Sequence, residues 1–482
     1  MKPLYRPLAL SFFIQTICFS ICALIGHLVF DENITDWIPS IIIALLLSFI
    51  CFNCIKPKNF LFTREILLTT GLLWLTTTCI GTLPYLLIAD CDFSTAFFES
   101  ASGLTTTGAS AINNIEQIPH SLLLWRALSQ WLGGLGLVIF FIPFLNHNDN
   151  SNKKLFLQET SFSDDSITLF NLRKNIISAL AMYLLLTIVC FLSLIYFKIP
   201  YFDAFCHTLS TVSTGGFSIY TGGLPSLHNV SVENISMIFM FLGGINFLFL
   251  AQIFTTKGPS FIFNQEFRTY IFLISLSTCI FTFLLIKNNL FSTYEAIHHA
   301  AFQAISIITT TGLHSCNYST WPSFALTLIL ILTFIGGCSG STSGGFKIFR
   351  ITALFKIITT QFEKVFHPSI IRSVRVNKIL LPENKQIELL HFFIISIFII
   401  FIGTLSIQAS MPSIDILTAT STIIACLSNV GPGITSTIGP NENFAQFTPS
   451  VKLILATIML LGRLEIYAIL ALFSRKFWKN FE

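Results

Sequence analysis

Residues 104–108 read Leu-Thr-Thr-Thr-Gly and form one of four related short turns in this chain. The related turns are Ser213-Thr214-Gly215, Thr309-Thr310-Thr311-Gly312 and the more divergent Asn429-Val430-Gly431. Each turn ends a short half-polar segment that follows a long apolar stretch. Marks that recur in one order at a spacing of roughly 100 residues indicate an internal repeat. The sequence therefore predicts four copies of one structural unit.

A second mark follows each turn at a spacing of roughly 24 to 31 residues, which strengthens the repeat. It reads Leu132-Gly133-Gly134, Leu242-Gly243-Gly244, Ile335-Gly336-Gly337 and Leu461-Gly462-Arg463. A single Gly turn could be ordinary packing. Four turns in register with four second marks favour a common role instead.

The composition excludes a soluble protein. Of the 482 residues, 53% are hydrophobic and only 10% are charged, and the mean hydropathy is +0.76. Soluble domains carry about 25% charged residues. A chain of this kind needs the bilayer as its solvent, so we expect a polytopic membrane protein.

Ten apolar stretches are long enough to span a membrane. They lie near 8–30, 38–55, 66–89, 121–145, 176–198, 233–256, 268–286, 321–338 with a continuation to about 358, 387–408 and 450–474. The first two contain no Gly turn and form an added N-terminal pair. The predicted fold is therefore all-α, with four units of span, half-helix and span (M1-P-M2) around a pseudo-fourfold pore. The predicted divisions are 1–60 for the N-terminal pair, 61–146, 147–257, 258–366 and 367–482 for the four repeats.

Four half-helices are predicted near 93–106, 202–213, 294–310 and 413–428, each too short to cross a bilayer. Residues that can cap a helix stand near their starts: Asp92, Asp203, Ser292 and Ser413.

The charges predict the topology. Lys and Arg accumulate in cytoplasmic loops, and placing the N-terminus inside puts most of them on the inner face while most acids lie outside. All four half-helices then enter from outside. The inner stretches 146–175 and 359–386 are the candidates for docking a soluble partner.

Four Gly turns at membrane depth point to cation passage. Non-helical backbone is tolerated there only when it is buried in protein or lines a cavity, and a ring of carbonyls can replace the water shell of a cation. The C-terminal ends of the half-helices and the acidic outer face favour positive charge as well.

Two further features of the sequence suggest a gate. Arg463 replaces the second Gly of its mark in mid-span, where a charge needs a wet cavity or a partner. The alternative is a structural ion pair with Glu465 or another helix. The 336–345 strip is Gly-rich and a poor helix former, so it could unwind below the turns and fill the pore. Arg126, nearer the outer end of its span, is expected to snorkel or to pair with Glu99.

Two enzymatic interpretations are weaker. The Gly-rich strip lacks the P-loop pattern because Phe346 stands between Gly345 and Lys347. Glu295, His298 and His299 have a spacing that could bind a metal, although a packing or vestibule role is favoured.

The motifs resemble one known family. Ser129-Gln130-Trp131-Leu132-Gly133-Gly134, residues 335–347, Leu427-Ser428-Asn429-Val430-Gly431-Pro432-Gly433 and Leu461-Gly462-Arg463-Leu464-Glu465 are similar to those of Trk-type bacterial potassium uptake proteins, the TrkH branch of the superfamily with KtrB and plant HKT proteins. The resemblance covers residues 60–475, and the extra N-terminal pair favours TrkH over KtrB.

The resemblance implies a potassium filter, a gate and partners. The implied filter residues are Thr106, Thr107, Gly108, Ser213, Thr214, Gly215, Thr310, Thr311, Gly312, Asn429, Val430 and Gly431. The implied gate comprises Arg463 with Gly336, Gly337, Gly340, Gly344, Gly345 and Lys347. K⁺ is the expected transported ion, with no organic cofactor and no nucleic acid. A homodimer in the bacterial inner membrane is implied, with both termini cytoplasmic and a TrkA-type cytosolic nucleotide-binding regulatory subunit.

Three alternatives remain open at this stage. The first is a sodium-permeable or cation-coupled symporter of the same fold, although a Gly at 108 sides with potassium because a Ser there goes with sodium in the family. The second is a polytopic membrane enzyme. The third is a sensor or scaffold with a permanently closed pore.

Overall fold

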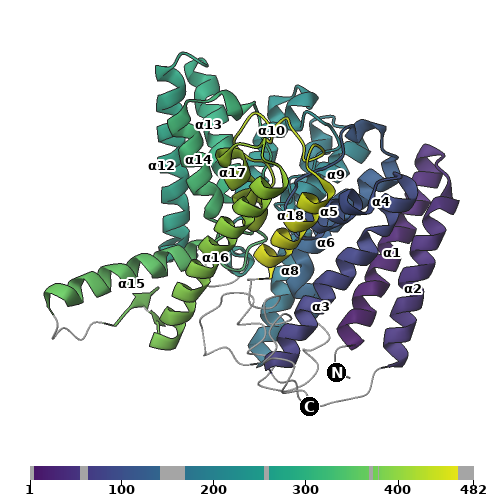
Figure 1. Cartoon of the computed structure of the whole chain (residues 1–482), viewed down its shortest axis with the longest axis horizontal. Coiled ribbons are helices and arrows are strands. Elements are labelled where there is room, and N and C mark those ends of the chain that lie inside the picture. Colours follow the sequence, from purple (N-terminus) through teal and green to yellow (C-terminus); the bar gives the residue numbers. More distant parts are fainter. Residues whose placement is uncertain are drawn as a thin grey trace.

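The structure is a computed structural model that describes residues 5–54, 63–141, 169–253, 260–367, 373–377 and 379–464. Helices make up nearly all of its regular structure (Figure 1). The described strands are β1 (Arg375–Val376) and β2 (Ile379–Leu380), which pair antiparallel as a small hairpin. The predicted all-helical membrane class is confirmed.

The N-terminal pair consists of α1 (Tyr5–Phe30) and α2 (Ile38–Asn53), joined by a 3-10 turn at Ile34–Trp37. The two helices pack on each other, and α1 also packs on the first unit. Figure 1 shows them as the outermost helices on one side of the molecule. Trp37 is buried and donates its indole N–H to Ser121 Oγ at 3.1 Å, which ties the pair to the first repeat unit.

The rest of the chain follows one pattern four times: span, half-helix, turn and second span. The first unit has α3 (Thr63–Gly81), α4 (Leu83–Ile88), α5 (Phe93–Leu104) and α6 (His120–Phe141), and the second has α8 (Leu169–Tyr196), α9 (Tyr201–Val212), α10 (Val230–Gly243) and α11 (Phe247–Gln252). The third has α12 (Gln265–Lys287), α13 (Thr293–Ile308), α14 (Ser323–Phe334) and α15 (Ile348–Phe366), and the fourth has α16 (Glu383–Ser410), α17 (Ile416–Leu427) and α18 (Pro449–Arg463). Short 3-10 turns at Ile115–Gln117, Leu224–Leu227, Ser260–Phe263 and Tyr318–Thr320 lie in the connections.

Within the described ranges, six helices are long and apolar enough to cross a membrane. They are Pro7–Phe30, Ile34–Asn53, Leu68–Ile88, Lys174–Tyr196, Gln265–Lys287 and Glu383–Ser410. These correspond to the N-terminal pair and to the first span of every unit. Among the second spans, α6 has 22 residues, whereas α10 and α14 are shorter and followed by breaks. The part of the last predicted span beyond residue 464 lies outside the described residues.

Two second spans are broken. In the second unit α10 ends at Gly243 and α11 begins at Phe247, a break that the sequence analysis did not predict. In the third unit the predicted break at the Gly-rich 336–345 strip is confirmed, and the stretch from 321 to about 358 is not one continuous helix. Residues 335–347, called here the 335–347 loop, separate α14 from α15, and Figure 1 shows α15 projecting sideways from the bundle. Gly337 and Gly340 explain the interruption, since Gly is a poor helix former.

The capping predictions hold for two half-helices. Asp92 caps α5, and Ser292 caps α13 through a capping box with Glu295. The other two are wrong. Pro200, not Asp203, precedes α9, and Asp415, not Ser413, caps α17 by accepting from Leu417 N at 3.2 Å.

The half-helices form a closed ring with the second spans of neighbouring units. Besides its own unit, α9 packs on α6, α13 on α10, and α17 on α14. The first half-helix, α5, packs on α18 at the other end of the chain. Each half-helix therefore touches the preceding unit, and the fourth unit adjoins the first.

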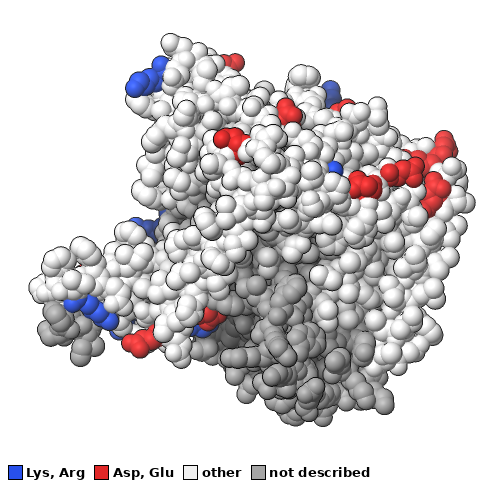
Figure 2. Space-filling view, viewed as in Figure 1, with Lys and Arg blue, Asp and Glu red and all other residues white. Residues whose placement is uncertain are grey.

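Charged residues are sparse on the surface. Figure 2 shows a nearly uncharged flank, with Asp and Glu gathered near the upper ends of α1, α2 and α4. An uncharged flank of this kind fits contact with lipid.

Candidate functional site

The four turns share one backbone conformation, with residues in left-handed geometry at alternate positions. Thr106, Thr214, Thr310 and Asn429 have φ between +52° and +56°. Two residues later, Gly108, Gly216, Gly312 and Gly431 have φ between +77° and +100°. Positive φ is uncommon for residues other than Gly, so its recurrence at four matching positions shows that the four turns share one unusual backbone conformation.

Backbone hydrogen bonds fix the register of the four turns. The residue between the two left-handed positions donates to the carbonyl five residues earlier in every turn. The four bonds are Thr107 N to Ser102 O, Gly215 N to Ser210 O, Thr311 N to Ser306 O and Val430 N to Ala425 O. The turns are therefore residues 105–108, 213–216, 309–312 and 428–431.

This register corrects the sequence alignment of the second turn by one residue. Gly215 had been matched with Gly108, but its position corresponds to Thr107, and Gly216 is the counterpart of Gly108. Two adjacent glycines made both alignments possible in the sequence. The equivalent segment of the second unit is thus Thr214, Gly215 and Gly216.

The four turns meet in a ring. A Cβ added to Gly108 would lie 2.3 Å from Gly215 O, and one added to Gly216 would lie 1.9 Å from Thr311 O. One added to Gly312 would lie 1.9 Å from Val430 O, and one added to Gly431 would lie 2.6 Å from Thr107 O. Each glycine therefore faces the backbone of the next unit too closely for any side chain.

Serine hydroxyls brace three of the turns. Ser102 Oγ donates to Ala109 O at 2.6 Å, Ser210 Oγ to Phe217 O at 2.7 Å, and Ser306 Oγ to Leu313 O at 2.5 Å. Ala425 holds the matching position in the fourth unit. Asn429 partly replaces this brace, because its Nδ2 donates to Thr107 Oγ1 at 2.9 Å and so joins the fourth turn to the first.

A cavity of about 80 Å³ opens next to the ring. All four units line it, through Gly108, Gly216, Gly312 and Pro432, the residue after Gly431. Ser110, Ser218 and Asn441 add polar groups. An ion that reached the turns from this side would pass through the cavity.

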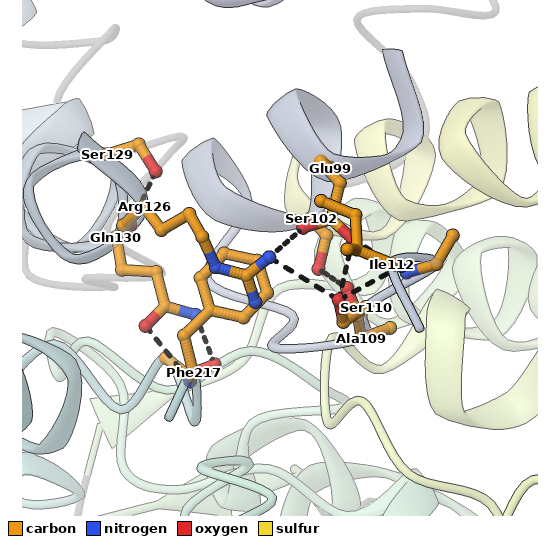
Figure 3. A network of polar contacts seen from close by, with 11 residues as sticks. Glu99, Ser102, Ala109, Ser110, Ile112, Arg126, Ser129, Gln130 and Phe217 are labelled. Atoms are coloured by element: carbon orange, nitrogen blue, oxygen red, sulfur yellow. Dashed lines mark hydrogen bonds and ion pairs between the residues drawn. The ribbon is translucent and has the colours of Figure 1, made fainter. Parts of the chain in front are cut away.

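A buried ion pair supports the first turn (Figure 3). Arg126 Nη1 lies 2.6 Å from Glu99 Oε2, and the two side chains are 2% and 0% exposed. Glu99 Oε1 accepts from Ser110 Oγ at 2.7 Å and from Ala111 N at 2.6 Å. The expected pairing of Arg126 with Glu99 is confirmed. The pair holds α5, α6 and the segment after the turn together.

Arg126 also reaches the second unit. Its guanidinium lies 4.1 Å from the centre of the Phe217 ring, and Figure 3 shows the side chain passing over that ring. The neighbouring Gln130 donates from Nε2 to Gly215 O at 2.6 Å and accepts from Phe217 N at 3.1 Å. The two residues of α6 therefore fix the second turn from the first unit.

The 335–347 loop folds back on itself. Gly336 N donates to Phe346 O at 3.2 Å, and Ile348 N donates to Gly337 O at 3.1 Å. Lys347 Nζ donates to Ser343 O at 2.5 Å, while Gly340 and Gly345 have φ of +72° and +67°. All residues predicted for the gate, except Arg463, lie within this loop.

The same loop contacts three of the four turns, at Thr214, Thr310 and Ser428. Thr342 Oγ1 lies 3.1 Å from Thr214 Oγ1, and Gly344 N donates to Thr310 Oγ1 at 2.6 Å. A Cβ on Gly344 would lie 2.6 Å from Ser428 O. The loop is thus packed directly against the ring.

Arg463 connects this loop to the first unit. Its Nη1 donates to Thr342 O and its Nη2 to Gly133 O, both at 2.9 Å. Glu465, the other partner considered, lies outside the described residues. Of the second marks, Gly133 and Gly462 lie against the half-helix ends, with added Cβ atoms 1.9 Å from Leu104 O and Leu427 O.

Two groups of functional interest were missed or misassigned from the sequence. Gln130 and Thr342 stood in quoted motifs but were given no role of their own, because their role depends on contacts between units far apart in the chain. Glu295 does not join His298 and His299, since it is exposed and caps α13. Glu233 of α10 lies beside them instead.

A family model and two curated relatives that match this chain all carry the name TrkH. A family model described as TrkH, cation transport protein, matches residues 37–480. The Trk system potassium uptake protein TrkH of Salmonella typhimurium is 31% identical over 430 residues, 88% of each chain. The TrkH of Vibrio parahaemolyticus is 30% identical over 467 residues, 95% of each chain.

A solved structure agrees in fold. The crystal structure of the potassium transporter TrkH from Vibrio parahaemolyticus superimposes with a TM-score of 0.88 at 27% identity and covers 99% of both chains. Sequence and fold agree over almost the whole chain, so this protein belongs to the TrkH family of cation transport proteins.

Proposed function

We propose that this protein takes up potassium ions across the inner membrane through the ring of four turns. The main support is the left-handed backbone conformation, with positive φ, that recurs in the four turns at residues 106 and 108, 214 and 216, 310 and 312, and 429 and 431. The relatives are named as potassium uptake proteins, which supports K⁺ as the cargo. Inward flow is driven by the membrane potential, about 2.3 kcal/mol per charge per 100 mV.

The filter consists of backbone groups of the four turns. Left-handed residues at alternate positions let successive carbonyls turn in the same direction, as replacement of a hydration shell requires. The proposed segments are Thr106 to Gly108, Thr214 to Gly216, Thr310 to Gly312 and Asn429 to Gly431, with Ser213 bracing the second. Within the second segment, Gly215 O also accepts from Gln130, which fixes this part of the filter in place.

The gate is the 335–347 loop together with Arg463. The loop packs against three turns, and Arg463 holds its Thr342 carbonyl from the opposite side. Gly336, Gly337, Gly340, Gly344 and Gly345 let the loop change conformation, and Lys347 closes it through Ser343. Conduction requires this loop to leave the space below the ring.

We further propose that the cavity faces outward and that both termini are cytoplasmic. The distribution of Lys and Arg along the chain supports this orientation. A homodimer with a TrkA-type cytosolic nucleotide-binding subunit on the basic inner face follows from the family resemblance. The repeat divisions at 61, 147, 258 and 367 belong to the same proposal.

Rubidium uptake into proteoliposomes tests the filter. We expect uptake by the unmodified protein to be blocked by external K⁺ and barely by Na⁺, and this preference to be lost in Gly108→Ser. Gly222→Ser is a matched control, because Gly222 lies outside the ring and a Cβ there meets only the flexible Ser226 side chain. Uptake equally sensitive to both ions, and unchanged in Gly108→Ser, would contradict the filter assignment.

A further inference from the structure

A second polar site lies between the second and third units, away from the ring. Glu233 is in the first turn of α10, and His298 and His299 are on α13. One possible ligand atom from each residue lies within 4.8 Å of the other two. In the described part of the chain, no other such group of three or more His, Cys, Asp and Glu residues occurs.

The hydrogen bonding of this group is incomplete. Nδ1 of His298 lies 3.6 Å from Glu233 Oε2, too far for a good hydrogen bond. Nε2 of the same ring is buried without a hydrogen-bond partner among the described residues. Both side chains are shielded, with exposed fractions of 9% for His298 and 11% for Glu233. Because no good hydrogen bond joins Glu233 Oε2 to His298 Nδ1, a ligand held between these two atoms would stabilise both, with Nδ1 as the binding nitrogen.

His299 is oriented as a metal ligand would be. Its Nδ1 is hydrogen-bonded to Ser315 Oγ at 2.8 Å, so Nε2 is the nitrogen available to a ligand. Metal-bound imidazoles usually hold their second nitrogen in such a bond, which fixes the ring orientation.

The donor set and its spacing select the metal. Zinc bonds of about 2.0–2.1 Å place neighbouring donors of a tetrahedron about 3.3 Å apart. The separation of 3.6 Å between His298 Nδ1 and Glu233 Oε2 needs only a small contraction, and the ligand atom of His299, within 4.8 Å of both, has to move closer as well. Two imidazoles and one carboxylate suit zinc and related transition metals, whereas K⁺ and Mg²⁺ prefer oxygen alone.

We propose that Glu233, His298 and His299 form a site for a zinc-class divalent transition metal, with water as the fourth ligand. The ion would clamp α10 to α13, and His299 with Ser315 would connect it to both sides of the third turn, since Ser315 follows Gly312 in the same connection. Bound metal restrains this turn and slows ion passage. This last effect rests on the proposed function, while the binding itself does not.

Zinc titration calorimetry of the purified full-length protein tests the site directly. We expect one zinc ion per chain, affinity reduced more than about 100-fold by His299→Ala or Glu233→Gln, and reduced about 10- to 100-fold by Ser315→Ala. His120→Ala is the matched control. It removes a histidine that also lies 3.6 Å from a carboxylate, that of Glu32, but in a pair without a third ligand. Absence of binding, or equal binding by all variants, would overturn the site.

Rubidium uptake with external zinc tests the effect on transport. Zinc should slow uptake by the unmodified protein and by His120→Ala but not by His299→Ala. Zinc bound at the three residues without any change in uptake would overturn the clamp. Zinc bound normally by a protein that takes up no rubidium under any condition would instead contradict the proposed function and leave the metal site standing.

Discussion

Arg463 Nη1 and the carbonyl oxygen of Thr342 lie 2.9 Å apart, although 121 residues separate them in the sequence. The same guanidinium donates to Gly133 O at 2.9 Å. One side chain of the fourth unit thus bridges the loop of the third unit and the second span of the first. The loop below the ring is held in place from a neighbouring helix as well as by its own bonds.

Arg463→Gln should increase rubidium uptake. A hydrogen bond from a charged group contributes about 1.5–3 kcal/mol, so losing it should raise the open fraction of the loop by roughly tenfold or more. The measurement is uptake into proteoliposomes at equal protein density. Arg268→Gln, at an exposed position in the first turn of α12, is the control. Uptake unchanged or lower in Arg463→Gln would argue against a restraining role.

Gly216→Ala and Gly215→Ala should differ sharply. Gly216 has φ of +80°, and an added Cβ would lie 1.9 Å from Thr311 O, so alanine must distort the ring. At Gly215 the Cβ meets only the Gln130 side chain, at 2.4 to 2.9 Å, so alanine would disturb the two hydrogen bonds of Gln130 but no backbone atom of another turn. We expect uptake to fall at least about tenfold for Gly216→Ala, as strain above about 1.4 kcal/mol implies, and clearly less for Gly215→Ala. The reverse order would restore the alignment of Gly215 with Gly108.

Glu99→Gln should destabilise the protein, because it leaves the Arg126 guanidinium buried without its counter-charge. Breaking one partner of a buried pair costs about 3–5 kcal/mol. Thermal unfolding in detergent, followed by size-exclusion chromatography, should show a clear decrease in the midpoint. Asp36→Asn, at an exposed position, should change stability by less than about 0.5 kcal/mol. Similar midpoints for both variants would count against the structural role of the pair.

Glu266→Gln should weaken the attachment of the 335–347 loop to α12. Glu266 is 4% exposed, and its Oε1 accepts from Ser339 N at 2.6 Å, which anchors the loop to α12. The neutral amide forms a weaker bond than the carboxylate. We expect higher rubidium uptake and faster proteolysis within the loop, with Glu383→Gln at the start of α16 as control. Proteolysis as slow as in the unmodified protein would show that this anchor is dispensable.

Much of the architecture is predictable because the signals are local. Apolar length identifies the spans, Gly turns such as that ending at Gly108 mark the half-helices, and Asp92 and Ser292 mark two of their starts. The cation transport class, and with it the prediction that the protein is not an enzyme, is confirmed by the family match.

The remaining features depend on contacts between distant units. The choice between Gly215 and Gly216 requires the hydrogen bond from Gly215 N to Ser210 O. The pairing of His298 with Glu233 instead of Glu295 joins residues 65 positions apart in the chain. In the sequence, the only mark of the break after Gly243 is the pair Gly243-Gly244. The equivalent pair in the first unit, Gly133-Gly134, lies inside the continuous helix α6.

The closure of the ring has a consequence for how the protein is made. Asn429 bonds to Thr107 across 322 positions of sequence, and Lys452 Nζ donates to Thr95 Oγ1 across 357. During synthesis Thr95 and Thr107 of the first unit therefore stay without these two partners until the last unit emerges. In intermediates that lack the fourth unit, chaperones or water should satisfy these polar groups. Chains truncated before Lys452 should be recognised as incomplete and degraded.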